Sequence, residues 1–252
     1  MTARRLIVVS GGGTGIGRAI ARRFAADGDD VIIVGRRAGR LADAAAEINA
    51  QAQRAAVTEL TADLREPGQV ERLAASVTRS GRAVDVLVNN AGGNFAPGQP
   101  AHLAGIRESW RLNVEGNVLP VVLLTAALLP AIRRPGGAIV TISSVAATRG
   151  PASYGGAKAA LHLWSTHLAG ELAGDGITVN VAAPGYVTGT EFYGARMNPE
   201  FHAGRARQAP MNRGADPAEV AGLVWYLAAS SARFITGQVI GIDGGALIVR
   251  QR

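Results

Sequence analysis

A tyrosine and a lysine spaced four residues apart carry the strongest chemical signal in this sequence. Tyr154 and Lys158 occur in the segment SYGGAKAAL, and on a helix this spacing places both side chains on one face. A free tyrosine has a pKa of about 10 and is a poor acid–base group near neutral pH. A neighbouring ammonium favours the phenolate and lowers that pKa. The pair can then donate a proton to a carbonyl oxygen or take one from an alcohol.

The basic residues of the chain single out this lysine. Lys158 is the only lysine among 26 lysines and arginines. Arginine cannot replace a compact ammonium whose proton is exchangeable, so a chain that uses arginine almost everywhere keeps this lysine for its chemistry. Ser144 lies just upstream, at the end of an expected strand, where its hydroxyl could bond the same substrate oxygen.

A glycine-rich turn, SGGGTGIG from Ser10 to Gly17, follows the first β-branched run. Gly11, Gly15 and Gly17 stand where a tight strand-to-helix turn needs residues without a Cβ, so that a pyrophosphate can approach backbone N–H groups. The dipole at the N-terminus of the next helix attracts the same anion. The turn therefore predicts a nucleotide site, formed by Gly11, Gly13, Thr14, Gly15, Ile16 and Gly17.

Two arginines after the second strand indicate which dinucleotide binds. A fold selective for NAD usually carries an acidic residue there, which accepts hydrogen bonds from the adenine ribose hydroxyls. Here Arg36 holds that position and Arg37 follows it. Because a guanidinium can bind two phosphate oxygens at once, we expect both arginines to face a 2′-phosphate. The sequence thus predicts NADP(H) as the cofactor, with NAD(H) as the alternative.

Short β-branched runs alternate with longer segments of helical periodicity, such as Gly17–Asp27 and Arg40–Gln51. This alternation predicts an α/β fold, a Rossmann-like, doubly wound parallel sheet of about seven strands with helices on both faces. Ligands of such sheets bind beyond the carboxyl ends of the strands. The expected strands are Leu6–Ser10, Val31–Val34, Ala55–Leu60, Val84–Val88, Ala138–Ser143, Thr178–Ala182 and Val239–Ile242.

Composition narrows the class of protein. The chain has 252 residues, 48% of them apolar, and no cysteine, which favours a single domain over residues 1–252 without disulfides. The longest apolar stretch, Val118–Ile132, is too short to span a bilayer and no secretory signal is visible, so we expect a cytoplasmic protein without membrane contact. The net charge is +7, but the arginines are scattered, so we expect no nucleic-acid partner. No cluster has metal-ligand spacing, and no metal is predicted.

Together with further motifs, these residues resemble the short-chain dehydrogenase/reductase family, in its compact form that includes many 3-oxoacyl-carrier-protein reductases. The matching pieces cover nearly the full length in the family's order. Besides SGGGTGIG, Ser144 and YGGAK, they are the Ala62–Asp63–Leu64 turn, NNAG at Asn89–Gly92, Asn113 in RLNVEGN, the Ala183–Pro184–Gly185 turn and ITGQVIGIDGG from Ile235 to Gly245.

The resemblance implies catalytic roles for four residues. Tyr154 would be the general acid or base, and Lys158 would also bond the nicotinamide ribose. Ser144 would steady the substrate oxygen, and Asn113 would interrupt its helix and hold a water of a proton relay. Cofactor contacts are likewise implied for Asp63, which would bond the adenine amino group, and for Leu64, Asn90, Ala91, Gly92, Pro184, Gly185, Val187, Thr188 and Thr190.

Three features depart from the family pattern. The interval between Ser144 and Tyr154 is shortened, so Ser143 competes with Ser144 as the functional serine. Thr188 and Thr190 compete for the contact to the nicotinamide carboxamide, beside the backbone of Val187. Pro120 lies inside a helix that the family keeps continuous, which predicts a kink.

Segment 190–212 is expected to select the substrate, since long segments over an active site often act as lids. It contains three arginines, Arg196, Arg205 and Arg207, that could receive a phosphopantetheine or a carrier protein, and the apolar residues Phe192, Tyr193, Met197, Phe201 and Met211. The resemblance also implies a homo-oligomer, a tetramer before a dimer. The sequence thus predicts an NADP(H)-dependent oxidoreductase of a small carbonyl or alcohol substrate. The alternative is a regulator that binds NADP(H) without turnover.

Overall fold

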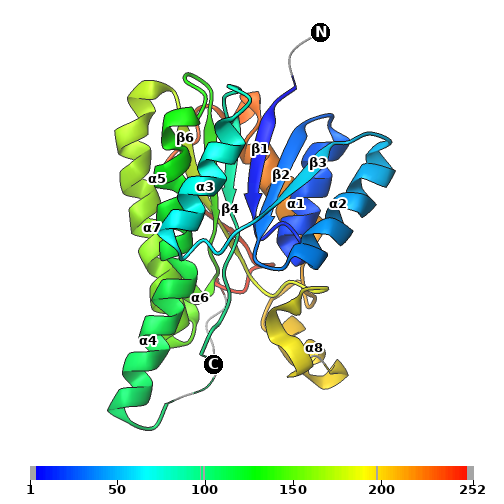
Figure 1. Ribbon diagram of the computed structural model, residues 1–252. Helices are drawn as coiled ribbons and strands as arrows, with labels where there is room; N and C mark the ends of the chain where they lie inside the picture. Colours follow the sequence, from blue (N-terminus) through cyan, green and yellow to red (C-terminus); the bar gives the residue numbers. More distant parts are fainter. Residues whose placement is uncertain (1–3, 97, 99, 197, 249–252) are drawn as a thin grey trace.

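Seven parallel strands form one sheet in the order β3-β2-β1-β4-β5-β6-β7 (Figure 1). The computed structural model describes residues 4–96, 98, 100–196 and 198–248. The strand order reverses between β1 and β4, the arrangement that opens a ligand crevice at the carboxyl ends of the strands. The strands are β1 (Leu6–Ser10), β2 (Asp30–Gly35), β3 (Val57–Thr61), β4 (Val86–Asn89), β5 (Ala138–Ile142), β6 (Thr178–Pro184) and β7 (Val239–Ile242).

Helices cover both faces of the sheet, which confirms the predicted Rossmann-like fold. On one face α1, α2 and α9 pack against the strands, and on the other α3, α5 and α7 do so. The α-helices are α1 (Gly15–Ala26), α2 (Ala38–Ala52), α3 (Pro67–Thr78), α4 (Leu103–Asn117), α5 (Leu119–Leu128), α6 (Ala146–Arg149), α7 (Ala152–Leu172), α8 (Pro199–Ala206) and α9 (Pro217–Leu227). Short 3₁₀ turns are η1 (Leu129–Ala131), η2 (Ala173–Asp175), η3 (Glu191–Arg196) and η4 (Ser230–Ala232).

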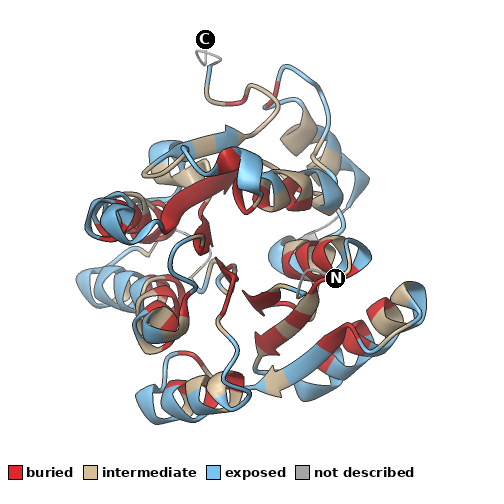
Figure 2. Cartoon of the chain, turned by 90° about the horizontal axis from the view of Figure 1, so that it is seen from above, coloured by how far each residue is buried: buried red, intermediate tan, exposed pale blue. Residues whose placement is uncertain are grey.

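The apolar strand runs form two cores because successive side chains of a strand point to opposite faces. In β1, Ile7 and Val9 enter one core, whereas Leu6 and Val8 enter the other. Figure 2 shows the buried central strands enclosed by helices whose outer faces are exposed. The continuous apolar character of β1, β4, β5 and β6 is therefore explained by burial on both sides.

The observed strand bounds differ slightly from the expected ones. β3 begins at Val57 instead of Ala55, and β6 continues through Pro184 because that residue still pairs with Ile242 of β7. β4 begins at Val86, and Val84 forms only an isolated bridge with Ile132. The strand ends that face the ligand crevice shift by at most two residues, the largest shift being that of β6.

The kink predicted at Pro120 is present as a break between α4 and α5 at Val118. A proline lacks the N–H for the helical bond and its ring crowds the carbonyl four residues earlier, here that of Gly116.

By length and composition alone, the stretch Leu103–Ala131 could cross a membrane. In its most apolar window 44% of the residues are buried inside the protein, and a core helix of a soluble protein passes the same test.

Candidate active site

A cavity of about 1150 Å³ lies beyond the carboxyl ends of the strands and brings most of the predicted residues together. Three predicted residues do not line it: Gly17, Asn113 and Thr188. The others do, namely Gly11, Gly13, Thr14, Gly15, Ile16, Arg36, Arg37, Asp63, Leu64, Asn90, Ala91, Gly92, Ser144, Tyr154, Lys158, Pro184, Gly185, Val187 and Thr190.

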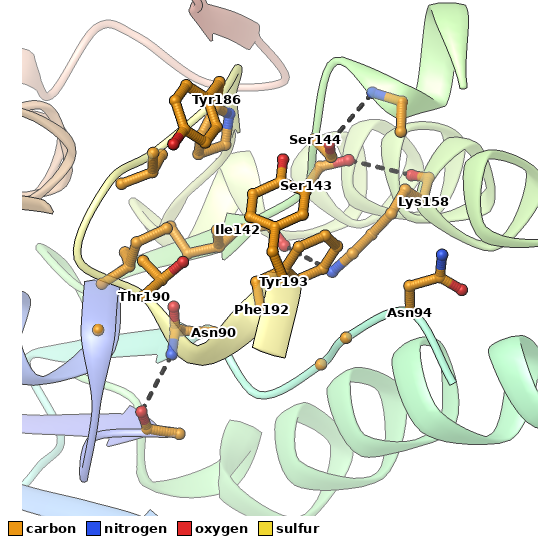
Figure 3. Close-up of a pocket in the computed structure, with 18 of the residues that line it drawn as sticks. Asn90, Asn94, Ile142, Ser143, Ser144, Lys158, Tyr186, Thr190, Phe192 and Tyr193 are labelled. Carbon is orange, nitrogen blue, oxygen red and sulfur yellow. Dashed lines mark hydrogen bonds between the residues drawn. The ribbon is translucent and has the colours of Figure 1, made fainter. Parts of the chain in front are cut away.

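Tyr154 and Lys158 lie one turn apart near the N-terminus of α7 and are both buried, with 7% and 4% of their surface exposed. Burial raises the pKa of Tyr154, because the phenolate would lose contact with water, and the hydrogen bond from Ser144 opposes that effect. The pKa of Tyr154 therefore lies above its ordinary value, and the lowered pKa that the sequence predicted is wrong for the protein by itself. Burial dominates, and the ammonium of Lys158 donates to the carbonyl oxygen of Ile142 at 3.1 Å (Figure 3).

Lys158 is an ammonium without a carboxylate partner among the described residues. Burial alone lowers its pKa to about 8, because the charged form is the one that loses hydration. A base with that pKa is largely protonated at pH 7 and can still exchange its proton near neutral pH. The same residue can therefore carry a positive charge beside Tyr154 and exchange a proton near neutral pH.

The geometry separates the two candidate serines. Ser144 follows β5 and its hydroxyl is hydrogen-bonded to the Tyr154 phenol, while it also accepts the backbone N–H of Ala146 at 3.1 Å. Ser143 faces the other way, donating to the carbonyl of Lys158 at 3.2 Å and sharing a 2.7 Å bond with Nε2 of His162 (Figure 3). Ser144 is thus the serine that can reach a substrate oxygen held by Tyr154.

Asn113 is fully buried, but it does not interrupt its helix as expected. α4 continues through it to Asn117, and the break occurs only at Val118, where Pro120 removes the helical bonding. The side chain of Asn113 accepts from the backbone N–H of Phe95 at 3.1 Å and donates to Ser153 at 3.1 Å. It therefore anchors the loop after β4 to α4 and α7.

Asn117, one helical turn after Asn113, was not singled out by the sequence. It is fully buried, accepts the N–H of Gly93 at 3.1 Å and donates to the Gly93 carbonyl at 2.9 Å. Its amide also donates to the backbone carbonyl of Asn113 at 2.9 Å. A Cβ on Gly92 would come within 2.7 Å of Asn117 and 3.1 Å of the Lys158 ammonium. The sequence feature that could have indicated Asn117 is the second asparagine of RLNVEGN, which lies four residues after Asn113 and therefore on the same helix face.

The glycine turn has the shape that the sequence predicts. Gly11 and Gly15 have φ angles of +67° and +51°, which residues with a Cβ adopt only under strain. α1 begins at Gly15 and has no acidic side chain in its first turn, so its positive end is free for an anion. Asn90 ties the turn to the end of β4 by donating to the Ser10 carbonyl at 2.9 Å (Figure 3).

The two arginines after β2 differ in their surroundings. Arg37 forms a 2.7 Å ion pair with Glu191 of η3, which also pairs with Arg40 at 3.2 Å. Arg36 has no carboxylate within ion-pair distance among the described residues and lines the same cavity. These arginines hold the pKa of Glu191 below its ordinary value, Arg37 most strongly through its hydrogen bond. Arg36 can therefore bind a phosphate without first breaking an ion pair.

Asp63 is engaged by an arginine that the sequence analysis passed over. Both carboxylate oxygens of Asp63 accept from Arg65, at distances between 2.5 and 3.2 Å. This hydrogen bonding is the main reason that the pKa of Asp63 lies below its ordinary value. The neighbouring Leu64 is buried beneath the cavity wall. An adenine bound here would meet an ionised Asp63 that already has a partner.

The competing threonines are separated by the loop after β6. Thr188 turns away from the cavity, and its hydroxyl donates to the carbonyl of Ala215 at 3.2 Å. Thr190 lines the cavity and lies 3.3 Å from the position that a Cβ of Gly15 would occupy. Val187 bridges to Ala215 and stays at the cavity wall. The geometry therefore favours Thr190 for a contact with the cofactor.

The segment 190–212 lies beyond the carboxyl ends of the strands as η3 and α8 (Figure 1). Its rings continue the wall of the cavity from Tyr154: Phe192 lies 5.6 Å from the Tyr154 ring and 4.9 Å from the Tyr193 ring. Tyr193 in turn lies 5.0 Å from Phe201. Met197 lies outside the described residues.

Among the described residues no group of three or more histidine or acidic side chains could hold a metal ion.

Known proteins match this chain along nearly all of its length. The family model described as enoyl-(acyl carrier protein) reductase matches residues 11–246. The 3-oxoacyl-[acyl-carrier-protein] reductase of rhamnolipid biosynthesis from Pseudomonas aeruginosa is 34% identical over 252 residues, covering 96% of each chain. L-Sorbose reductase from Gluconobacter frateurii, solved with NADPH and L-sorbose, superposes with a TM-score of 0.87 at 30% identity, covering 98% of each chain.

A second solved structure is a single-substitution variant of actinorhodin polyketide ketoreductase with NADPH. It superposes with a TM-score of 0.85 at 32% identity and covers 96% of this chain and 97% of its own. The enzymes named here act on different substrates, so the likeness extends to fold and reaction class and not to one substrate. The full-length match, the sheet order and the tyrosine–lysine pair at the cavity agree, and this chain belongs to the short-chain dehydrogenase/reductase family of oxidoreductases.

Proposed function

We propose that this protein is an NADP(H)-dependent oxidoreductase that interconverts a carbonyl and an alcohol on a small molecule. The observation that carries the proposal is one cavity that joins the buried Tyr154–Lys158 pair to the glycine turn and to Arg36. Each of these features suits one part of the reaction: proton transfer, pyrophosphate binding and recognition of a 2′-phosphate.

The residues present fit a dinucleotide phosphate. The glycine turn and the uncapped N-terminus of α1 offer backbone N–H groups to the pyrophosphate. Arg36 would hold the 2′-phosphate, and Asp63 the adenine, at the end of β2 and β3. On the nicotinamide side, Asn90–Gly92, Pro184–Gly185, Val187 and Thr190 line the cavity next to Tyr154 and Lys158. The solved relatives that hold NADPH support the same choice of cofactor.

Tyr154 would exchange a proton with the oxygen of the substrate. When NADPH is bound, it supplies the hydride that the carbonyl carbon receives. Tyr154 would donate its phenolic proton to the carbonyl oxygen, and Ser144, whose hydroxyl is hydrogen-bonded to the same phenol, would hold that oxygen in reach. In the direction of oxidation, Tyr154 takes the proton of the alcohol.

Lys158 would restore the proton that Tyr154 gives up. Its ammonium stabilises the phenolate that forms, and its pKa of about 8 lets it lose and regain a proton near neutral pH. Asn113 and Asn117 act on the site through the backbone, because they hold Phe95 and Gly93 of the loop beside the cavity. We therefore propose them as positioning residues.

Replacing Tyr154 with phenylalanine tests the enzyme against the regulator. Tyr154→Phe removes the exchangeable proton and keeps the buried ring, so we expect turnover to fall about 100- to 10,000-fold, in line with a general acid–base contribution. Cofactor oxidation is measured by absorbance on a panel of ketones, quinones and 3-oxoacyl thioesters, and NADPH binding by fluorescence titration. Binding should be retained. Unchanged turnover in the variant would exclude Tyr154 as the acid, and binding without turnover in the wild type would favour the regulator.

The assembly and location of the protein belong to the same proposal. Large apolar side chains are exposed on α4 and α7, among them Leu103, Trp110 and Leu163, and Phe234 is fully exposed before β7. Such surfaces suit contacts between copies of the chain, so we propose a homo-oligomer, a tetramer before a dimer. We propose a cytoplasmic enzyme without nucleic-acid or membrane partners, in which segment 190–212 covers the substrate.

A further inference from the structure

We propose that the substrate carries an anionic oxygen group, a carboxylate or a phosphate, which Arg205 of α8 binds in the cavity that also contains Tyr154. This inference rests on the proposed function, since it concerns the substrate of the same site. Arg205 lines the cavity and is partly buried. Its guanidinium carbon lies 5.1 Å from the centre of the Tyr193 ring and 5.8 Å from that of Phe201.

An aromatic wall connects the catalytic phenol to this guanidinium. The ring of Tyr154 contacts Phe192, and Phe192 contacts Tyr193 edge-on. The hydroxyl of Tyr193 then accepts a 2.8 Å hydrogen bond from Arg205. Figure 3 shows Phe192 and Tyr193 beside the residues around Lys158. A substrate with its carbonyl at Tyr154 would therefore lay an apolar body along these rings before reaching Arg205.

Arg205 retains donors that no group of the described chain takes. A guanidinium has five N–H donors, and the structure uses one on Gln208, at 3.0 Å, and one on Tyr193. Its Nε is buried and has no acceptor. No carboxylate of the described residues pairs with Arg205, whereas Arg37, Arg65 and Arg213 around the same cavity each pair with one. A partly buried cation without a counter-charge is unfavourable, and a bound anion would compensate it.

The acidic side chains of the cavity wall cannot serve as that counter-charge. All four of them in the described lining are bound elsewhere, three to arginines and one to backbone N–H groups: Asp63, Glu191, Glu219 and Asp243. None of these four carboxylates lies within ion-pair distance of Arg205. The planar fork of arginine matches a carboxylate or phosphate better than it matches a neutral oxygen.

The alternative role of Arg205 is a brace that only holds Tyr193 and Phe201 in place. The two roles differ in what they predict for pairs of substrates that share a skeleton and differ in charge. A brace affects both members of a pair equally, whereas an anion-binding residue affects only the charged member. Arg207, two residues further along at the end of α8, is exposed and does not line the cavity, so Arg207→Met is a matched control.

The experiment compares Arg205→Met, Arg205→Lys and Arg207→Met with the wild type. The carboxylate arm uses aryl and alkyl oxo acids of increasing length with their methyl esters, and the phosphate arm uses hydroxyketone phosphates with the parent alcohols. We expect the wild type to prefer the charged member of at least one pair about 10-fold or more in kcat/KM, since hydrogen bonds to charged groups are stronger than those to neutral groups. Arg205→Met should lose that preference, mainly because KM for the charged member rises more than KM for the neutral member. Arg205→Lys should keep part of the preference for the charged member, and Arg207→Met should show the same preference as the wild type.

Two results would overturn the inference: a wild type that prefers the neutral members, or an Arg205→Met variant that loses both members equally. In either case, turnover of the neutral members leaves the proposed function standing. Turnover of no member, together with none of the ketones, quinones and 3-oxoacyl thioesters, would refute the proposed function. Thermal protection by the charged compounds in the presence of NADP⁺ then decides the role of Arg205. Protection of the wild type but not of Arg205→Met supports the anion site, and equal protection refutes it.

Discussion

Replacing Lys158 with methionine should make this protein more stable at pH 7, although it removes a group that the proposed chemistry needs. The lysine is buried, and burial lowers its pKa from 10.5 to about 8. A shift of that size corresponds to about 3 kcal/mol against the folded state at pH 7, at about 1.4 kcal/mol for each pKa unit. Methionine fills a similar space without a charge.

The pH dependence of this effect has a definite sign. Because the pKa of Lys158 is lower in the folded protein than in the unfolded chain, the unfolded chain binds more protons between pH 8 and pH 10.5. The folding free energy contributed by the lysine therefore improves as the pH rises through that window, and the full penalty applies below pH 8. The advantage of Lys158→Met should shrink by about 2 to 3 kcal/mol between pH 7 and pH 10.

Urea unfolding of the wild type and the variant at pH 7 and pH 10 measures this change. The variant also loses the hydrogen bond to Ile142 and alters the packing, but these contributions are the same at both pH values and cancel in the comparison. An exposed control, Arg207→Met, should show no such change. A difference in unfolding free energy between wild type and Lys158→Met that stays constant from pH 7 to pH 10 would refute the reasoning.

Three further changes test the cofactor and substrate contacts. Arg36→Ser should lower the kcat/KM preference for NADPH over NADH about 10- to 100-fold, because a charge-assisted contact to the 2′-phosphate is lost; an unchanged ratio would mean that another group reads the phosphate. Glu191→Gln should speed cofactor release in stopped-flow fluorescence by up to about fivefold, since it breaks the exposed pair with Arg37; equal release rates would show that this pair does not hold the cofactor. Ser144→Ala should lower kcat about 100-fold, as expected for one lost donor, and Ser143→Ala much less; the reverse order would make Ser143 the functional serine.

Local patterns determined the fold and the identity of most candidate residues. The alternation of strand and helix patterns is set by burial. Because the strands are buried on both faces, they appear as continuous apolar runs that can be recognised in the sequence. The glycine turn and the tyrosine–lysine pair depend on spacing within one turn or one helix, so the sequence could place them as well. The same holds for the break that Pro120 causes, since proline acts within its own helix.

Only the tertiary structure decided questions that involve residues distant along the chain. Ser143 and Ser144 are adjacent, and the packing of α7 against β5 determines which of them faces Tyr154. The pairing of Arg37 with Glu191, 154 positions away, leaves Arg36 for a phosphate. The pKa of Tyr154 is the property for which the sequence-based prediction was wrong. Proximity of Lys158 in the sequence suggested a lowered pKa, but desolvation depends on how much protein surrounds the phenol, and that depends on the whole fold.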